Sequence, residues 1–237
     1  MILNYLSPEQ LFEHTLSVPA KETIDLCIFS VDNFSLLKNH MTILSPKEQK
    51  KASSLRQEQD RIRFVTSRIL LRRFLGRYLN YPADKLLFET GEHGKPYLCP
   101  SNPNFHQVHF NLSHSGKFVA LAFSTTSPVG IDIEKTRTNI HAETLIRRFF
   151  HPDEYSEFLK LREDEKQAFL FRRWTVREAF LKGLGKGFSI SPDSFYVQEQ
   201  PYMFCIKKCQ KDYSSWHILA VPVPKDYYCS LAYQVPV

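Results

Sequence analysis

The sequence predicts a mixed fold of helices and strands arranged in two related halves. Helical and alternating strand patterns occur on both sides of the chain's middle. Residues 45–48 (S-P-K-E) resemble residues 151–154 (H-P-D-E) at a shift of 106. At a shift of 109, four residues match four others: Arg63, Thr66, Arg68 and Gly76 against Arg172, Thr175, Arg177 and Gly185. We therefore expect a duplicated fold with a three-residue insertion in the second half, where Ile69 would occupy the place of Glu178.

Composition excludes several classes of protein. The 237 residues are 43% hydrophobic and 24% charged, which is ordinary for a globular protein with a real core. The N-terminus has no basic, apolar signal-peptide pattern, and no run is apolar enough to span a membrane. The five cysteines are scattered without a C-x-x-C pair, which favours reduced thiols and a cytoplasmic location.

The first half begins with an alternating strand pattern over Ile24–Val31. Ser45, Pro46 and Glu48 then predict a helix start, because they provide an N-cap, a first-turn proline and a capping box. Apolar spacings of three and four predict an amphipathic helix over Phe64–Leu79.

Positive charge is concentrated in this first half. Between Lys47 and Arg77 there are ten lysines and arginines against three acidic residues, while the whole chain carries a net charge of +6. Most of these side chains fit a solvated helix face. A cluster this dense also indicates contact with phosphates or with an acidic partner.

Two polar segments follow a short strand pattern over Leu86–Glu89. Gly91–Pro96 is a turn that holds Lys95 between Gly94 and Pro96. We interpret Phe110–Gly116 as a polar turn that offers amide, hydroxyl and imidazole donors to an anion, or as an ordinary hairpin turn. The strand Phe118–Phe123 comes next, and Thr125–Pro128 is the expected linker.

The second half opens on the strand Val129–Glu134. Because side chains alternate along a strand, Asp132 and Glu134 point from the same face. Two such carboxylates repel each other, so a cation between them is one interpretation of this pattern. The alternative interpretation is an exposed edge strand with two surface acids. Gly130 permits a close approach of another backbone.

Helical patterns follow over 139–150 and 151–162, and a third helix lies within 172–187. On this third helix, Trp174, Glu178 and Lys182 are spaced by four and form one stripe. The alternative is a surface Glu–Lys pair beside a buried tryptophan. Glycines end the helix, and the tail from Ser194 predicts an antiparallel sheet.

Asp132, Glu134 and Glu178 form a set of hard oxygen ligands that suits Mg²⁺. Lys182, Lys95, Lys51 and His114 are available to phosphates. We therefore predict metal-assisted phosphoryl or phosphodiester chemistry at a single site between the halves, since the carboxylates occur in only one of them. The alternatives are a Mg²⁺-dependent nuclease or other phosphohydrolase, and a basic nucleic-acid-binding module.

Three motifs in this order resemble the Sfp-type 4'-phosphopantetheinyl transferases: N-L-S-H-S-G, V-G-I-D-I-E, and W-T-V-R-E-A-F-L-K-G-L-G-K-G. The resemblance implies an α+β pseudodimer with an N-terminal half (1–124), a linker (125–128) and a C-terminal half (129–237), active as a monomer. It implies coenzyme A as donor and a serine of an acyl or peptidyl carrier protein as acceptor, in fatty-acid or secondary-metabolite synthesis. We expect an acidic carrier and neither nucleic-acid nor membrane partners.

The resemblance also implies roles for individual residues. Asp132, Glu134 and Glu178 resemble the Mg²⁺ ligands, and Glu178 resembles the base toward the carrier serine. Residues expected to contact coenzyme A are Lys51, Lys95, Asn111, Ser113, His114, Trp174 and Lys182. One position departs from the family pattern, because Arg177 stands where a lysine usually precedes the helix glutamate.

Overall fold

The computed structural model describes residues 1–7, 10, 17–92, 94–99 and 108–235. The chain divides into two compact units, which are described separately. The first contains Met1–Thr90 and Pro96–Thr126, and the second contains Gly91–Lys95 and Ser127–Val237. The short segment Gly91–Lys95 therefore groups with the second unit, although the residues on both sides of it belong to the first.

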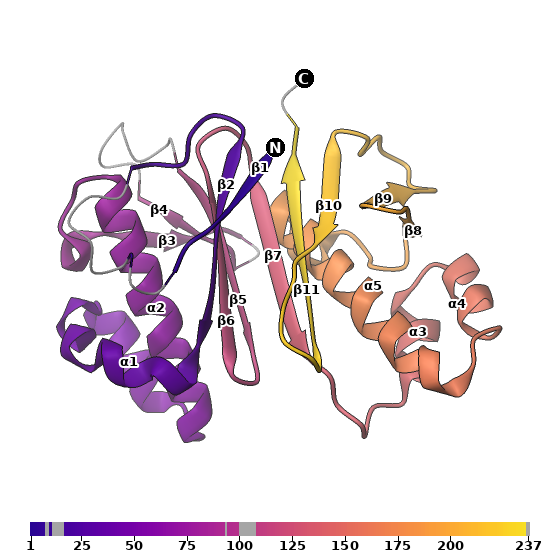
Figure 1. Ribbon diagram of the computed structural model, residues 1–237, viewed down its shortest axis with the longest axis horizontal. Helices are drawn as coiled ribbons and strands as arrows, with labels where there is room; N and C mark the ends of the chain where they lie inside the picture. Colours follow the sequence, from indigo (N-terminus) through magenta and orange to yellow (C-terminus); the bar gives the residue numbers. More distant parts are fainter. Residues whose placement is uncertain (8–9, 11–16, 93, 100–107, 236–237) are drawn as a thin grey trace. The chain divides into compact units, whose positions relative to one another are not determined.

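The first unit is a four-stranded sheet in the order β1-β2-β6-β5, with a long helix, α2, packed on it (Figure 1). Its elements are β1 (Ile2–Tyr5), β2 (Thr23–Ser30), a 3₁₀ segment (Val31–Ile43), α1 (Pro46–Ser54), α2 (Glu58–Tyr78), a 3₁₀ turn (Ala83–Lys85), β3 (Phe88–Thr90), β4 (Pro96–Leu98), β5 (His109–Ser115) and β6 (Phe118–Ser124). The strands β3 and β4 form a separate hairpin.

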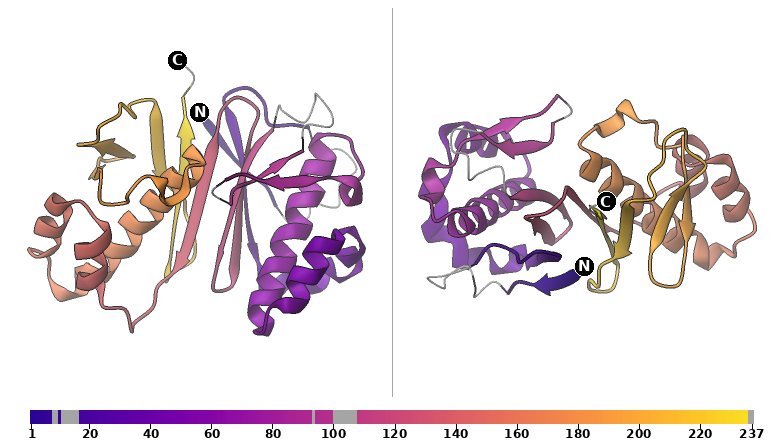
Figure 2. Two further views of the ribbon diagram at one scale, coloured as in Figure 1. Left: turned by 180° about the vertical axis from the view of Figure 1, so that it is seen from behind. Right: turned by 90° about the horizontal axis from the view of Figure 1, so that it is seen from above.

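The second unit is a five-stranded sheet in the order β7-β11-β10-β9-β8, with α5 packed across β7 and β11 (Figure 2). Its elements are β7 (Val129–Lys135), α3 (Ala142–Phe149), α4 (Pro152–Phe158), α5 (Glu163–Leu184), a 3₁₀ turn (Gly187–Ser189), β8 (Tyr196–Glu199), β9 (Phe204–Lys207), β10 (Trp216–Ala220) and β11 (Tyr227–Gln234). The antiparallel pairing of β8 to β11 confirms the predicted β-rich tail.

Local sequence signals account for the ends of these helices. The Ser45 N–H donates to Glu48 Oε2 at 2.8 Å, and the Glu48 N–H donates to Ser45 Oγ at 3.3 Å, so the predicted capping box starts α1. α5 ends at Gly185, whose φ of 68° lies in the left-handed region that favours glycine.

The prediction of a polar turn over Phe110–Gly116 is wrong, because His109–Ser115 is strand β5. It pairs with β6 in antiparallel register from His109↔Ser124 to Ser115↔Phe118. The polar residues on one face of β5 are buried, so they occupy interior positions that normally hold apolar residues. Polarity alone therefore indicated a loop where the backbone is a fully paired strand.

The two units share one topology, which confirms the predicted duplication. In the first, β2 pairs with β6 and β6 pairs with β5, all antiparallel, and α2 packs on this sheet. In the second, β7 pairs with β11 and β11 pairs with β10 in the same way, and α5 packs on that sheet.

A buried ion pair at the same place in each unit fixes the register of the duplication. Arg72 Nε lies 2.7 Å from Glu48 Oε2, and Arg177 forms the corresponding pair with Glu154. Each glutamate is the third residue of a helix that begins with proline, and each arginine lies on the long helix that follows.

The sequence shift between the two long helices is therefore 105 residues, since Arg72 corresponds to Arg177. The predicted shift of 109 is wrong by about one helical turn. In the corrected register, Arg73 takes the place of Glu178, so the first unit has a cation where the second has a carboxylate.

Two further observations concern the cysteines and the helices. None of the five cysteines, all of which lie in the described part of the chain, is in a disulfide. Across the described residues, no helix is both long and apolar enough to cross a membrane.

The Glu154–Arg177 pair predicts a large asymmetry between single and double substitutions. Arg177→Met leaves the fully buried Glu154 with one guanidinium fewer, so we expect a loss of roughly 3–5 kcal/mol in unfolding free energy. A Glu154→Leu/Arg177→Met double variant should recover part of this loss. Urea denaturation measures both.

The exposed pair Arg172–Glu199 provides the control, and Arg172→Met should change stability by less than about 1 kcal/mol. Equal losses from Arg172→Met and Arg177→Met would contradict a structural role for the buried pair.

Candidate active site

Two elements of the second unit carry the charged side chains that the sequence singles out. Asp132 and Glu134 come from β7, and Glu178 and Lys182 come from α5. Figure 1 shows α5 running across the strand that carries the first two. The residues of each pair share one face of their element, because strands repeat every two residues and helices every 3.6.

The backbones of β7 and α5 meet at two glycines. A Cβ on Gly130 would lie 2.0 Å from the Ala179 carbonyl oxygen and 2.3 Å from the Gly183 nitrogen. A Cβ on Gly183 would lie 2.5 Å from the Trp216 ring. Neither position has room for a side chain, which confirms the predicted close approach at Gly130.

Lys182 and Asp132 form the centre of the cluster. Lys182 Nζ donates a hydrogen bond to Asp132 Oδ1 at 2.6 Å, and Asp132 is only 3% exposed. Burial by itself would lower the pKa of Lys182, but the carboxylates of Asp132, Glu178 and Glu134 raise it above its ordinary value. The ammonium therefore stays charged at neutral pH.

For Glu178, burial and the neighbouring carboxylates shift the pKa in the same direction. Burial raises the pKa of the Glu178 carboxyl, and the charge of Asp132 raises it further, while Lys182 opposes them and Glu134 adds to them. Each of these groups therefore lies within the electrostatic field of the others. The structure joins Asp132 to Lys182 directly, and Glu178 and Glu134 act on this pair electrostatically.

Hard carboxylate oxygens are the donors that Mg²⁺ prefers, so the chemistry of the three acids fits this ion. Within the described ranges, no group of three or more His, Cys, Asp or Glu side chains is arranged so that it could hold a metal ion. The cation beside Asp132 is the Lys182 ammonium. The Mg²⁺ site accordingly stays a prediction that rests on the donor set.

Trp174 lies on the same helix and packs against aromatic side chains. Its ring contacts Phe149 edge-on at a centroid distance of 5.8 Å and Phe150 at 6.3 Å. It belongs to a hydrophobic cluster formed by α3, α4 and α5.

Four of the predicted contacts to coenzyme A lie in the first unit, namely Lys51, Asn111, Ser113 and His114. Asn111 and Ser113 are buried on one face of β5, whereas His114 is exposed on the other. Lys51 is exposed in the last turn of α1. Ser113 and His114 therefore point from opposite faces of a strand, because successive side chains alternate.

Lys95 has well-defined partners within the second unit. Its ammonium donates to the Val129 and Gly183 carbonyl oxygens, both at 3.2 Å. Burial lowers the pKa of Lys95 to about 8. Sequence reasoning missed this arrangement, because the partners are backbone atoms far away in the chain.

Arg177, the departure from the family pattern, takes no part in the charged cluster. Its guanidinium pairs with Glu154 and donates to the Pro192 carbonyl at 3.2 Å. The Phe150 ring lies 4.0 Å from the guanidinium carbon. Arginine suits this site because its planar fork contacts several acceptors and one ring at once, so the role of the position is structural.

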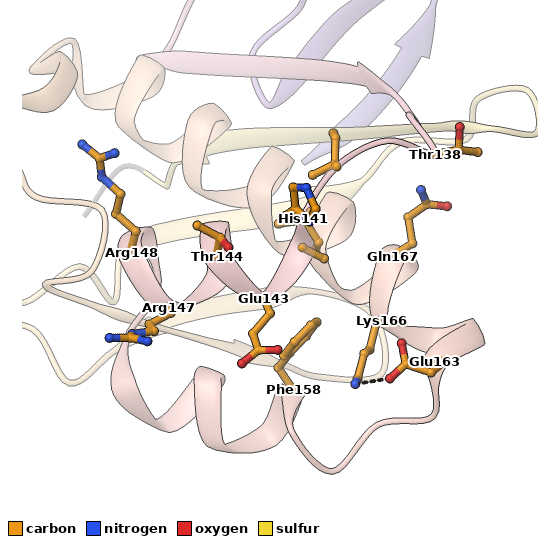
Figure 3. A pocket seen from close by; sticks show the side chains of 13 residues that line it. Thr138, His141, Glu143, Thr144, Arg147, Arg148, Phe158, Glu163, Lys166 and Gln167 are labelled. Carbon is orange, nitrogen blue, oxygen red and sulfur yellow. Dashed lines mark hydrogen bonds and ion pairs between the residues drawn. The ribbon is translucent and has the colours of Figure 1, made fainter.

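The second unit also contains a pocket of about 820 Å³, lined by the loop after β7, by α3 and α4, and by the N-terminal half of α5 (Figure 3). Within it, Lys166 points to Glu163, with which it forms an ion pair. Arg147 and Arg148 lie at one end. None of the residues predicted for the active site lines this pocket.

Gly130→Ala should separate β7 from α5. The added methyl group would meet backbone atoms of α5, which cannot rotate away, so we expect a loss of about 3 kcal/mol in unfolding free energy. Gly91→Ala is the control, because its Cβ would only reach ordinary contact at 3.5 Å from the Lys95 carbonyl oxygen. Thermal unfolding measures both variants, and a harmless Gly130→Ala would refute the close approach.

Comparison with known proteins identifies the family. A 4'-phosphopantetheinyl transferase superfamily model matches residues 128–232, and a model of the N-terminal part of 4'-phosphopantetheinyl transferases matches residues 33–126. The chain is 36% identical to 4'-phosphopantetheinyl transferase Sfp of Bacillus subtilis over 158 residues, which are 67% of each chain.

Two other relatives support the same family assignment. The chain is 36% identical to 4'-phosphopantetheinyl transferase HetI of Nostoc over 153 residues, 65% of this chain and 64% of that protein. It is 33% identical to 4'-phosphopantetheinyl transferase gsp of Aneurinibacillus migulanus over 153 residues, 65% of this chain and 61% of that protein. The function of this family is the transfer of phosphopantetheine to carrier proteins, with coenzyme A as substrate. The chain belongs to the Sfp-type 4'-phosphopantetheinyl transferases.

Proposed function

We propose that this chain transfers the 4'-phosphopantetheine group of coenzyme A to a serine of an acyl or peptidyl carrier protein in a Mg²⁺-dependent reaction. The observation that carries the proposal is the charged cluster of Asp132, Glu134, Glu178 and Lys182 at the junction of β7 and α5. Family membership favours transfer over the phosphohydrolase and nucleic-acid-binding alternatives.

The reaction is a phosphoryl-type displacement. The serine oxygen forms a bond to the phosphorus that carries pantetheine, and the bond from that phosphorus to the bridging pyrophosphate oxygen breaks. Adenosine 3',5'-bisphosphate leaves with the bond's electron pair. The main requirement is neutralisation of charge on the bridging and leaving oxygens.

Glu178 accepts the proton of the serine hydroxyl. Its burial and its carboxylate neighbours raise its pKa, which makes it a better proton acceptor than an exposed glutamate. Lys182, kept charged by the surrounding acids, donates to the pyrophosphate oxygens as they become more negative.

Asp132, Glu134 and Glu178 would hold the Mg²⁺ ion. The bound ion supplies positive charge that polarises the pyrophosphate and offsets the repulsion among the three carboxylates. Asp132 is fixed for this task by its hydrogen bond to Lys182 and by its place in a paired strand.

The first unit supplies contacts to coenzyme A in this proposal. Lys51, Asn111, Ser113 and His114 contact its nucleotide and phosphates. Trp174 packs near the pantetheine arm. These assignments rest on the resemblance of the motifs to those of the family.

The net charge of +6 supports an acidic carrier protein as partner, and the proposed reaction involves neither a nucleic acid nor a membrane. Two related halves in one chain support action as a monomer. The five scattered cysteines, which form no C-x-x-C pair, support a cytoplasmic location.

The decisive experiment is the mass of an apo carrier protein after incubation with this chain, coenzyme A and Mg²⁺. We expect the carrier to gain one phosphopantetheine group and adenosine 3',5'-bisphosphate to appear. Asp132→Asn and Glu178→Gln should each lower the rate by at least about 10²-fold, because each removes a charge at the reacting centre. Glu58→Gln, which alters an exposed carboxyl, is the control. An unmodified carrier, or full activity in both cluster variants, would refute the proposal.

Glu178→Gln should also stabilise the metal-free protein at about pH 8 by roughly 0.5–2 kcal/mol. Because its folded-state pKa is raised, Glu178 contributes stability below its unfolded-state pKa and loses it as the pH rises through the folded-state pKa. The gain should therefore vanish near about pH 4, where the carboxyl is protonated.

Thermal unfolding with and without Mg²⁺ measures this effect. Mg²⁺ should stabilise the wild type and not the variant. The exposed carboxyl of Glu58 again provides the control. A Glu178→Gln variant that is less stable than the wild type at about pH 8 without metal would contradict the expectation.

A further inference from the structure

Lys95 reaches the active-site junction from a distant part of the sequence. It follows Gly94, whose φ of 83° is a glycine conformation, and precedes Pro96, which fixes the chain direction. The segment Gly91–Lys95 is compactly associated with the second unit. Its lysine ammonium contacts backbone rather than side-chain acceptors there.

One acceptor is the last turn of α5. Gly183 is among the last four residues of this helix, whose carbonyl groups have no partner within the helix. An ammonium group there satisfies a carbonyl and interacts favourably with the helix dipole. Lys95 Cδ would also lie 3.5 Å from a Cβ built on Gly185, so the side chain runs along the helix end.

The other acceptor is the start of β7. Val129 is the first residue of this strand and lies three residues before Asp132, while Gly183 directly follows Lys182. A single ammonium group therefore joins the strand that carries Asp132 to the helix turn that carries Lys182.

Resting on the proposed function, we propose that Lys95 is a positioning residue that holds α5 against β7 and thereby fixes the Asp132–Lys182 pair. In this role its ammonium binds the Val129 and Gly183 carbonyls rather than a phosphate of coenzyme A. Gly130 lets the two backbones approach, and Lys95 holds them at that separation.

Burial of the group agrees with this role. Desolvation lowers the pKa of Lys95 to about 8, and both of its hydrogen-bond acceptors are neutral carbonyls. A surface lysine that binds phosphate stays hydrated until the ligand arrives, so burial does not lower its pKa.

The test compares Lys95→Met with Lys160→Met, which removes an exposed ammonium from the same unit. First, amide hydrogen exchange is measured without substrate. The Gly185 N–H donates to the Leu181 and Lys182 carbonyls, so loss of the tie should speed its exchange by at least about tenfold. Lys160→Met should leave it unchanged.

Second, kcat and KM are measured with coenzyme A and with 3'-dephospho-coenzyme A. Lys95→Met should lower kcat by about 10- to 100-fold with both donors, since small misplacement of reacting groups reduces rates to this extent. The ratio of the two KM values should match the wild type. Lys95→Arg, which retains N–H donors, should recover part of kcat and of the Gly185 protection.

The opposite pattern would overturn the proposal. If Lys95→Met raised KM for coenzyme A but not for 3'-dephospho-coenzyme A, and left Gly185 exchange unchanged, Lys95 would be a phosphate ligand. A wild type unable to modify any carrier would refute the proposed function instead. In that case the exchange experiment still decides whether Lys95 holds α5 against β7.

Discussion

The contact between the backbones of β7 and α5 at Gly130 and Gly183 is the constraint on which the site depends. Charged side chains interact strongly only when the elements that carry them lie close together. The two glycines remove the side chains that would keep strand and helix apart. The same approach places Asp132 within hydrogen-bond distance of Lys182 and within the electrostatic field of Glu178.

The two units use one architecture for different chemistry. In the second, Asp132 on β7 accepts a hydrogen bond from Lys182 on α5. In the first, Asp25 on β2 accepts one from Tyr78 on α2 at 2.6 Å. Burial and the neighbouring Asp25 raise the pKa of Tyr78, so this pair remains a neutral hydroxyl donating to a carboxylate. Strand and helix are joined in both units, through a hydroxyl at Tyr78 in the first and through an ammonium at Lys182 in the second.

The sequence predicts the charged cluster well because the relevant periods are short. The spacing of Asp132 and Glu134 on a strand, and of Glu178 and Lys182 on a helix, determines which side chains share a face. Family motifs then indicate that the two faces meet. The predicted capping box of α1 is similarly a local signal that the structure confirms.

Long-range features are less accessible. The buried polar face of β5 carries no apolar alternation, so Asn111 and Ser113 indicated a turn. The register of the duplication depends on which arginine reaches Glu154, and a chance match one helical turn away gave the wrong answer. The partners of Lys95 are carbonyl groups, which every residue has and no pattern marks.

The Asp25–Tyr78 pair also shows how a duplicated fold can keep a buried acid with an uncharged partner. A buried carboxylate that loses its only cation destabilises a fold by several kcal/mol. A tyrosine hydroxyl at nearly the same place meets the same acid without a charge. The buried acid of the first half is therefore held by an uncharged donor, and the acid that pairs with a lysine lies in the second half.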